Sequence, residues 1–397
     1  MIMKKIIPYG KHFIDSKDIK SVIKNLKSGS ITQGPTIEKF ENKIKKILNC
    51  KYAVAVSSCT AGMHISLIAC GFKKENTLLT SPISFVSTAN VSKFCGGKVS
   101  FADIDLNDIN ISLDKIKKKI KKRKIDAIIP VHFAGKAFET KKLKRIINKK
   151  TIIIEDAAHA LGAKYEDGTM VGSCKHSHAT VFSFHPVKSI ACGEGGVVTT
   201  NDKKIYKNLL RLRSHGINKL DDNFIIKNQA FTKKIRNPWY YEMRNLGFHY
   251  RMTEIQASLG ISQLSKLNKF IKKRTSIAKK YFNFIKKNED ILNFNLAQKV
   301  NYDDSSNHLF IIKLNLNKIK KTRAEIMKQL LKKKIQTQVH YIPIPMHPYY
   351  RNEKKTYISD FKNAKTYYET CLSIPIFYSL TMQQQNYVLD NLKKIIN

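Results

Sequence analysis

The sequence comprises 397 residues, of which 42% are hydrophobic, and it carries a formal net charge of +42 at pH 7. This length exceeds the usual size of one hydrophobic core, so we expect two domains. No apolar run approaches the roughly 20 residues that span a bilayer, and the N-terminal sequence lacks a secretory h-region. We therefore exclude a membrane-spanning protein and expect a cytoplasmic one.

The cysteines and the positive charge each suggest a class of function that other features of the sequence argue against. Seven cysteines are an odd number and form no CxxC pair, so neither a disulfide framework nor a metal site is expected. Lysine is spread over nearly every expected helix, and arginine, the usual residue for reading nucleic acid, is scarce. We expect no specific nucleic-acid partner, while a non-catalytic basic protein that binds polyanions stays open as an alternative.

The N-terminal region predicts two helices, a strand and a third helix. The two helices lie within residues 9–40, are joined by the turn-rich sequence SGSITQGP, and the first is capped at Asp15. YAVAVSS at 52–58 is typical of a buried strand, and the next helix begins near Thr60 and Ala61. A helix N-terminus offers free N–H groups and a partial positive charge, so small residues there suit a phosphate. Many helices begin in this way without binding one.

Three further apolar runs, at 98–105, 125–135 and 151–157, alternate with lysine-rich helical segments. Near-continuous apolar strands that alternate with helices predict an α/β fold whose parallel sheet is covered on both faces. His132 lies near the end of one of these strands, at the edge of the sheet where ligands bind. A structural role and a direct role are both open for this histidine.

The chemically richest stretch lies in the middle of the chain, where two strand-like runs end in reactive side chains. The first delivers Asp156 and His159, and the second delivers Ser183, His185 and Lys188, followed by GEGG. Because ligands bind at the carboxyl ends of parallel strands, we expect these groups to converge. A lysine among apolar neighbours loses its proton more easily and can form a Schiff base. Such a lysine with an acidic partner for a pyridine nitrogen is typical of enzymes that use pyridoxal 5'-phosphate (PLP).

Each of these side chains also has a plainer interpretation. Asp156 could cap the turn that follows it, and Ser183 could satisfy a local backbone group. Asp156 and His159 have no third ligand at a suitable spacing, so a metal is not indicated. Lys188 is one lysine among many, but its setting, VFSFHPVKSIACGEGG, is mostly apolar or small, which favours the catalytic interpretation.

A helix near residue 209 is expected to close at Gly216, and an irregular stretch follows at 218–237. The next sequence, NPWYYEMRNLGFHYRMTE, is rich in aromatic residues and arginine. That composition is enriched at protein interfaces, although core aromatics before a helix are the alternative.

The C-terminal region predicts a long helix and a smaller unit. An amphipathic helix should run from Thr253, whose capping box is completed three residues later, to about Lys287. Residues from 288 onward read as an α+β unit with strands at 305–316 and 336–345.

Two segments carry a resemblance to a known family. EDAAHALG at 155–162 and FSFHPVK…GEGG at 182–196 are similar to those of the DegT/DnrJ/EryC1/StrS family of PLP-dependent sugar aminotransferases. The resemblance covers essentially the whole chain and implies PLP-transferase fold type I, the aspartate aminotransferase-like α/β fold. It implies a large PLP-binding domain with a mostly parallel sheet at 1–252, a linking helix at 253–287, and a smaller C-terminal α+β domain at 288–397.

The same resemblance implies how PLP is held. Lys188 would be the catalytic residue that binds the cofactor covalently, and Asp156 would contact the pyridine nitrogen. Phe85 would stack on the ring, and His159 would lie near the phenolic oxygen. The residues implied for the phosphate are Thr60, Ala61 and Ser183.

A homodimer with its active site at the interface is also implied. In the family an asparagine reaches across the dimer to the phosphate, and this sequence has His249 there, which can still donate a hydrogen bond. The positions implied for substrate are Tyr9, Gly29, Ser30, Ile31, Thr32, Cys59, His185, His340, Tyr341, Ile342 and Pro343.

The segments HPVK, PVHFAG and SSNHL resemble one branch of the family. That branch moves the amino group of L-glutamate, leaving 2-oxoglutarate, to C4 of a UDP-linked 4-keto-6-deoxy-N-acetylhexosamine for pseudaminic acid or a related cell-surface sugar. Another nucleotide-linked ketosugar, with its ketone at C3 or at C4 of a pentose, is the alternative substrate. A dehydratase branch of the family has histidine in place of the lysine, and Lys188 argues against it.

Overall fold

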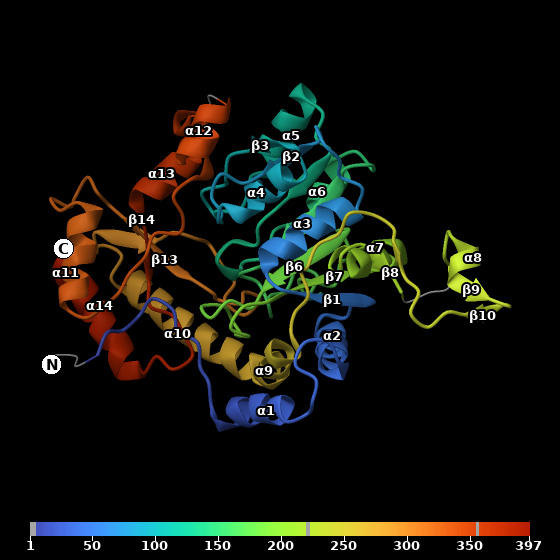
Figure 1. Ribbon diagram of the computed structural model, residues 1–397. Coiled ribbons are helices and arrows are strands. Elements are labelled where there is room, and N and C mark those ends of the chain that lie inside the picture. Colours follow the sequence, from blue (N-terminus) through green and yellow to red (C-terminus); the bar gives the residue numbers. More distant parts are fainter. Residues whose placement is uncertain (1–4, 220–222, 355–356) are drawn as a thin grey trace.

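The computed structural model describes residues 5–219, 223–354 and 357–397. Within these ranges no helix combines the length and the apolar character needed to cross a bilayer. At the centre lies a seven-stranded sheet in the order β1-β7-β6-β5-β4-β2-β3 (Figure 1). Its strands are β1 (Tyr52–Val56), β2 (Thr77–Thr80), β3 (Lys98–Phe101), β4 (Ala127–Ile129), β5 (Ile152–Asp156), β6 (Ala179–Ser183) and β7 (Gly196–Thr200).

The sheet is mostly parallel, which confirms the predicted fold class. The five strands from β3 to β6 run parallel, and only β7 is antiparallel to both of its neighbours. Asp156 at the end of β5 lies opposite Val181 of β6, two residues before Ser183. Strands β5 and β6 therefore end side by side, and the segments that follow them start from the same edge of the sheet.

Helices cover both faces of this sheet, as expected for parallel strands buried on two sides. One face packs against α3 (Cys59–Ala69), α4 (Ser87–Phe94) and α7 (Lys203–Leu212). The other packs against α2 (Pro35–Leu48), α5 (Leu113–Lys122) and α6 (Thr140–Ile146). Because side chains alternate along a strand, Ile154 and Asp156 point to the first face and Ile153 and Glu155 to the second.

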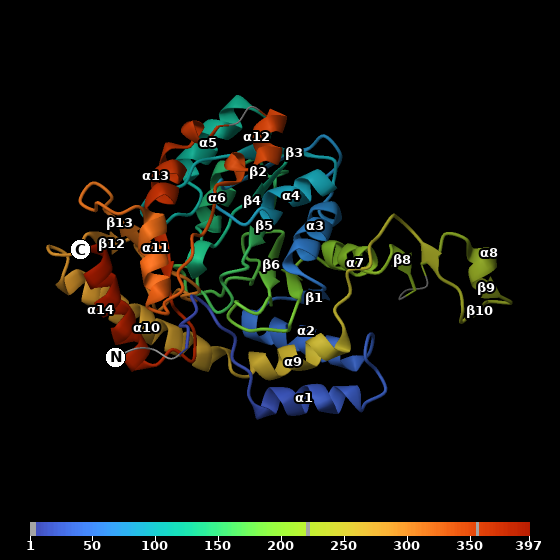
Figure 2. The same ribbon diagram turned by 60° about the vertical axis from the view of Figure 1, so that its left-hand side comes forward.

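The C-terminal part has a core of its own around an antiparallel sheet in the order β12-β13-β14. Tyr281, Phe294 and Leu372 are among the buried side chains of this cluster. Figure 2 shows three helices of this part, α10, α11 and α14, on the side of the molecule that carries the C-terminus. Its elements are β12 (Phe294–Leu296), β13 (Phe310–Leu314), β14 (Cys371–Ile374), α11 (Arg323–Lys332), α12 (Pro348–Lys354), α13 (Lys362–Thr370) and α14 (Met382–Ile396).

Contacts between the two parts hold the active-site edge in place. One apolar cluster combines Phe101 and Phe133 of the large part with Leu309 and Tyr367 of the small part. Asp103, after β3, accepts hydrogen bonds from two N–H groups in the first turn of α13, each at 2.9 Å. The domain boundaries near 252 and 288 stay a prediction, and the two parts share an apolar contact.

The segment predicted as one helix from Thr253 to Lys287 is two helices, α9 (Glu254–Leu264) and α10 (Leu267–Lys287). The capping box at the start of α9 is present. The interruption falls at Lys266, whose ammonium group lies 2.5 Å from the Asp18 carboxylate and 3.0 Å from Asp15. Both acids belong to the start of α1 (Ser16–Leu26), which lies beside α9 (Figure 1). No glycine or proline marks this break, so local sequence could not predict it.

The strand predicted at 336–345 is reduced to a single bridge between Gln338 and Ser373, and a 3-10 turn at Ile344–Met346 follows. Pro343 and Pro345 have no N–H to donate to a ladder, so a strand could not pair regularly through residues 343–345. The strand predicted at 305–316 is confirmed but is shorter, at Phe310–Leu314.

A narrow arm projects from the large part and carries α8, β9 and β10 at its tip (Figures 1 and 2). Gly216, at the base, has φ +73°, and a Cβ there would lie 1.7 Å from the Asn245 oxygen, so only glycine fits the turn. The arm's elements are β8 (Ile217–Asn218), α8 (Lys227–Ala230), β9 (Phe231–Thr232), β10 (Ile235–Arg236) and β11 (Glu242–Met243).

Candidate active site

A cavity of about 640 Å³ opens where β5 and β6 end and the small part meets the large one. This volume lies within the range of roughly 300–1,000 Å³ typical of small-molecule sites. Segments that lie far apart in the sequence, from Tyr9 to His347, meet there because the strand ends share one edge of the sheet. The predicted site residues that line it are Tyr9, Cys59, Thr60, Phe85, Asp156, His159, Ser183, His185, Lys188, His340, Tyr341 and Ile342.

Lys188 lies in the turn after β6 and its main-chain N–H donates to the His185 carbonyl at 2.9 Å. Its side chain lines the cavity in a setting with few charges. Burial lowers the pKa of Lys188 to about 8, although the nearby Asp156 carboxylate and Cys59 act in the opposite direction. About a tenth of this amine is therefore uncharged at pH 7 and able to act as a nucleophile, far more than for an ordinary lysine.

Asp156 is held by its main chain and by its side chain. Its N–H donates to the Pro130 carbonyl at 2.9 Å, and its own carbonyl accepts from His132 at 3.0 Å. The carboxylate accepts from the Thr88 hydroxyl at 2.8 Å and from the Ala158 N–H at 3.1 Å. The side chain is buried, yet it reaches the cavity wall and can hold a protonated ring nitrogen.

The start of α3 provides the predicted anion site. Ser58 caps the helix by accepting from the Ala61 N–H at 3.1 Å. Among the described residues, the N–H groups of Cys59 and Thr60 have no acceptor, and both residues line the cavity. Ala61 lies one position deeper and its N–H is already used. Ser183 faces the same cavity from the end of β6.

Phe85 is an aromatic residue left open to the cavity. Its side chain is 58% exposed, which is unusual for phenylalanine, and its ring centroid lies 6.2 Å from that of Tyr341. An exposed ring at a cavity wall offers a stacking surface for a flat ligand. Ala158, which lines the same cavity, is too small to block such a ligand.

His159 is the most constrained of the predicted side chains. Its Nδ1 atom receives the Ala134 N–H at 3.3 Å, and its Nε2 atom lies 3.1 Å from the Tyr341 hydroxyl. The imidazole of His308 packs against it, with ring centroids 4.4 Å apart. Burial, with Lys188 and His340 nearby, holds the pKa of His159 well below its ordinary value, so the ring is neutral.

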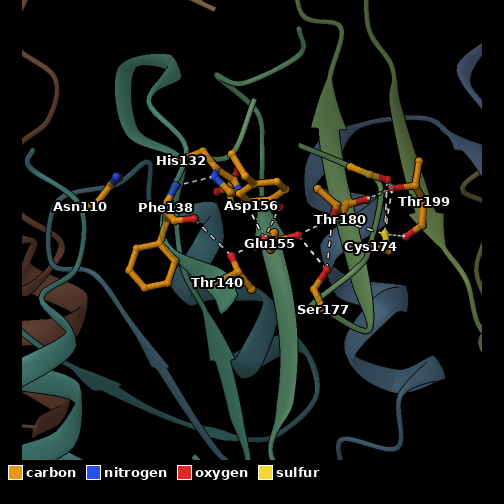
Figure 3. A network of polar contacts seen from close by, with 12 residues as sticks. Asn110, His132, Phe138, Thr140, Glu155, Asp156, Cys174, Ser177, Thr180 and Thr199 are labelled. Atoms are coloured by element: carbon orange, nitrogen blue, oxygen red, sulfur yellow. Dashed lines mark hydrogen bonds and ion pairs between the residues drawn. The ribbon is translucent and has the colours of Figure 1, made fainter. Parts of the chain in front are cut away.

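Behind Asp156, on the opposite side of β5, the buried Glu155 carboxylate lies at the centre of a polar network (Figure 3). It accepts from the hydroxyls of Tyr165 at 2.6 Å, Ser177 at 2.7 Å and Thr180 at 2.6 Å, and also from Thr140. The Nε2 atom of His132 lies 3.5 Å away. This answers the question left open for His132: it contacts the network behind the strand and does not line the cavity.

Several predicted site residues lie outside the cavity of this single chain. Gly29, Ser30, Ile31 and Thr32 form the loop between α1 and α2, where the Ile31 carbonyl accepts from the first residue of α9 at 3.1 Å. Pro343 follows the lining segment. Their roles in substrate binding stay predictions.

His249 is exposed on the chain that leads into α9. It pairs with Ser214 through an antiparallel bridge, and its ring centroid lies 5.3 Å from that of His215. It does not line the cavity, so the predicted phosphate contact would need a second copy of the chain.

The structure adds Thr88, Ser84 and His308 to the side chains that hold or line the site, and none of them was predicted. Thr88 holds the Asp156 carboxylate and exchanges a hydrogen bond with Ser84 at 2.7 Å. His308 lines the cavity, and its Nδ1 atom is buried with no hydrogen-bond partner. The segment SSNHL contained His308, but nothing local in the sequence indicates that its ring packs on His159.

Comparison with known proteins identifies relatives along the full length of the chain. Residues 12–393 match the family described as the DegT/DnrJ/EryC1/StrS aminotransferase family. A UDP-4-amino-4,6-dideoxy-N-acetyl-beta-L-altrosamine transaminase from Campylobacter jejuni is 34% identical over 394 residues, which cover 98% of each chain.

Two solved structures show the same fold. Helicobacter pylori PseC, an aminotransferase involved in the biosynthesis of pseudoaminic acid, superposes with a TM-score of 0.86 at 31% identity, and 99% of each chain is covered. The PLP form of Spr1654, a putative sugar aminotransferase from Streptococcus pneumoniae, gives a TM-score of 0.85 over 98% of each chain. At 24% identity, that second likeness concerns the fold.

Proposed function

The chain belongs to the DegT/DnrJ/EryC1/StrS aminotransferase family, and from that premise we propose that it aminates C4 of a UDP-linked 4-keto-6-deoxy-N-acetylhexosamine with L-glutamate as donor. The observation that carries the proposal is Lys188, whose pKa is lowered to about 8 and which lines the same cavity as Asp156. The choice of sugar is supported by the Campylobacter jejuni relative, whose name is that of a UDP-4-amino-4,6-dideoxy sugar transaminase, and by Helicobacter pylori PseC, whose name concerns pseudoaminic acid.

The cofactor of this aminotransferase is PLP, and the side chains of the cavity fit it. The free N–H groups of Cys59 and Thr60 suit its phosphate. The fixed carboxylate of Asp156 suits its ring nitrogen, and Phe85 suits its flat face. When bound, PLP supplies an electron-accepting ring for amino transfer.

The protein's own groups then have distinct tasks. The Asp156 carboxylate holds a proton on the ring nitrogen, and Thr88 and the Ala158 N–H keep that carboxylate in place. Lys188 Nζ would take a proton from the donor carbon that carries the amino group and deliver it to the cofactor carbon that receives that group, a role that suits a base with a pKa near the working pH. The neutral ring of His159 adds no positive charge that would compete with this transfer.

A homodimer is part of the proposal. The projecting arm carries apolar side chains that are mostly in contact with solvent, among them Ile235 at 73%, Trp239 at 71% and Leu246 at 79% exposure. Exposed apolar groups gathered on one arm are typical of an interface. In such a dimer His249 would approach the partner's cavity and donate to the phosphate.

The test uses the purified protein with PLP, 15N-labelled L-glutamate and three candidate ketosugars. We expect the UDP-linked 4-keto-6-deoxy-N-acetylhexosamine to gain a 15N amino group, detected by mass spectrometry. Conversion of only a 3-ketosugar or a pentose 4-ketosugar would overturn the choice of sugar. Light scattering of the same sample measures the oligomeric state, and a monomer that turns over at full rate would contradict the dimer.

A further inference from the structure

The hydrogen bonds around His159 determine where its proton lies. Ala134 donates its main-chain N–H to Nδ1 at 3.3 Å, and a main-chain N–H can only donate. Nδ1 must therefore present its lone pair. A neutral imidazole carries one proton, so that proton lies on Nε2.

The surroundings keep this imidazole neutral. The His308 ring lies 4.4 Å away at an angle of 37°, and a charge on both rings would be repulsive. The side chains of Lys188 and His340 also approach His159 and disfavour a positive charge there. Asp156 lies one turn back on the same segment, but its carboxylate is occupied by Thr88 and Ala158. No carboxylate among the described residues bonds to His159.

The position of this proton determines the direction of the hydrogen bond between His159 and Tyr341. Nε2 of His159 lies 3.1 Å from the Tyr341 oxygen, and the proton on Nε2 makes His159 the donor. Tyr341 accepts at its oxygen, so its own hydroxyl proton must point elsewhere. Among the described residues that hydroxyl has no other hydrogen-bond partner, and Tyr341 lines the cavity.

Aromatic neighbours limit the movement of the Tyr341 ring. Phe133 meets it edge to face at 6.3 Å, and the His159 ring lies nearly parallel to it, at 24°. Burial raises the pKa of Tyr341, so the hydroxyl keeps its proton and acts as a donor. Tyr341 is partly buried and lines the cavity, so a ligand that displaces water from this wall has to offer the hydroxyl an acceptor oxygen.

We propose that Tyr341 is a ligand-binding residue, which donates its hydroxyl proton to an acceptor oxygen of the bound ligand while His159 serves only to orient it. The inference rests on the proposed function for the identity of the ligands. The acceptor has two sources: the phenolic oxygen of PLP or an oxygen of the ketosugar. In either case the single proton of His159 is used by Tyr341, so His159 would not donate to the phenolic oxygen as predicted. Only in the first case would Tyr341 make that contact instead.

The first experiment compares Tyr341→Phe with Tyr367→Phe. Tyr367 is a matched control, because its buried hydroxyl donates to the His340 carbonyl at 2.7 Å and is satisfied within the protein. PLP binding is titrated by absorbance without sugar, and kcat and KM are then measured separately for L-glutamate and for the UDP-linked 4-ketosugar.

The two acceptors give different patterns. If the acceptor is the phenolic oxygen, Tyr341→Phe weakens PLP binding about 10- to 100-fold and shifts the visible absorbance with no sugar present. If it is a sugar oxygen, PLP binding and reaction with glutamate are unchanged, and kcat/KM for the sugar falls about tenfold. If every quantity stays within about twofold of the Tyr367→Phe values, the proposal is wrong.

A second measurement does not depend on any variant folding. In 15N NMR of the intact apoprotein, His159 should show a protonated Nε2 and an unprotonated Nδ1 that do not change between pH 6 and 8. A protonated Nδ1 would overturn the proposal. Failure of the proposed function appears differently, as wild-type protein that binds PLP and reacts with glutamate but leaves the ketosugar unchanged.

Discussion

Glu155 and Asp156 are neighbours on β5, yet their carboxylates lie in two contrasting environments. On the Glu155 side, four hydroxyl groups donate to the carboxylate, so the protein itself supplies the hydrogen bonds of this group (Figure 3). His132 Nε2 approaches it to 3.5 Å without a hydrogen bond. On the Asp156 side, several groups have no partner within the protein. These are the N–H groups of Cys59 and Thr60, the Nδ1 atom of His308 and the hydroxyl proton of Tyr341.

The two sides of β5 therefore have different roles: the Glu155 side stabilises the fold, and the Asp156 side binds ligands. Buried polar groups that find all their partners within the chain contribute to stability and to a unique fold. Groups that lack partners cost stability, and they persist where a ligand satisfies them. Replacements on the two sides should therefore have different consequences, activity on one side and stability on the other.

The largest expected effect is on the cavity side, at Lys188. Lys188→Ala removes both the covalent attachment and the base, so amino transfer should fall by a factor of about 10³ or more. The stability of the protein should not decrease, because the variant removes a buried cation. Lys313, exposed on β13, provides the control, and Lys313→Ala should retain wild-type turnover. Full activity of Lys188→Ala would refute the assignment.

The second largest effect is expected at Asp156, which is adjacent to Glu155 on β5. Asp156→Asn keeps the shape of the side chain but loses the charge that holds a proton on the ring nitrogen. We expect kcat to fall by about 10²–10³. The urea unfolding midpoint should change little, since Thr88 can still donate to the amide oxygen. A variant that loses stability but keeps its kcat would show that Asp156 belongs with the structural side.

Glu155→Gln should reduce stability more than activity, the reverse of what is expected for Asp156→Asn. The amide presents a donor to hydroxyl groups that already donate, and it removes the charge that His132 faces. Unfolding free energy should decrease by about 3 kcal/mol. The kcat of the folded variant at low temperature should fall far less than that of Asp156→Asn. Urea denaturation and steady-state kinetics on both variants provide the measurements, and equal stability in the two would contradict the division.

The smallest expected effect is on the pH dependence of the unfolding free energy, to which the buried Glu155 carboxylate contributes. Burial on its own raises the pKa of Glu155, but contacts with His132, Thr140 and Thr180 outweigh it and lower the pKa to about 2. A lowered carboxyl pKa contributes stability above the unfolded value of 4.5, and the contribution is lost as the pH falls towards 2. Between pH 7 and pH 3.5 the loss should be about 1.4 kcal/mol. The Glu155→Gln variant has no carboxyl group at this position, so its unfolding free energy should not show this loss between pH 7 and pH 3.5. Urea denaturation of both proteins at several pH values measures the difference.

The sequence determined the features that depend on neighbours in the chain. Apolar runs predicted the parallel strands β3, β4, β5 and β6, and the capping residues predicted where α1 and α9 begin. The motifs around Asp156 and Lys188 indicated the family and the cofactor, because the residues that perform the chemistry follow two strands directly. Parallel pairing then brings the ends of those strands together.

Only the tertiary structure decided the contacts between distant segments. Lys266 meets Asp18 across 248 residues, at the point where α9 ends and α10 begins without a local signal. Thr88 reaches Asp156 across 68 residues, and Tyr341 meets His159 across 182. Such contacts depend on which way each side chain points after the sheet has formed, and a linear pattern contains no information about that direction. The sequence therefore predicted the reacting groups, whereas folding determined what orients them.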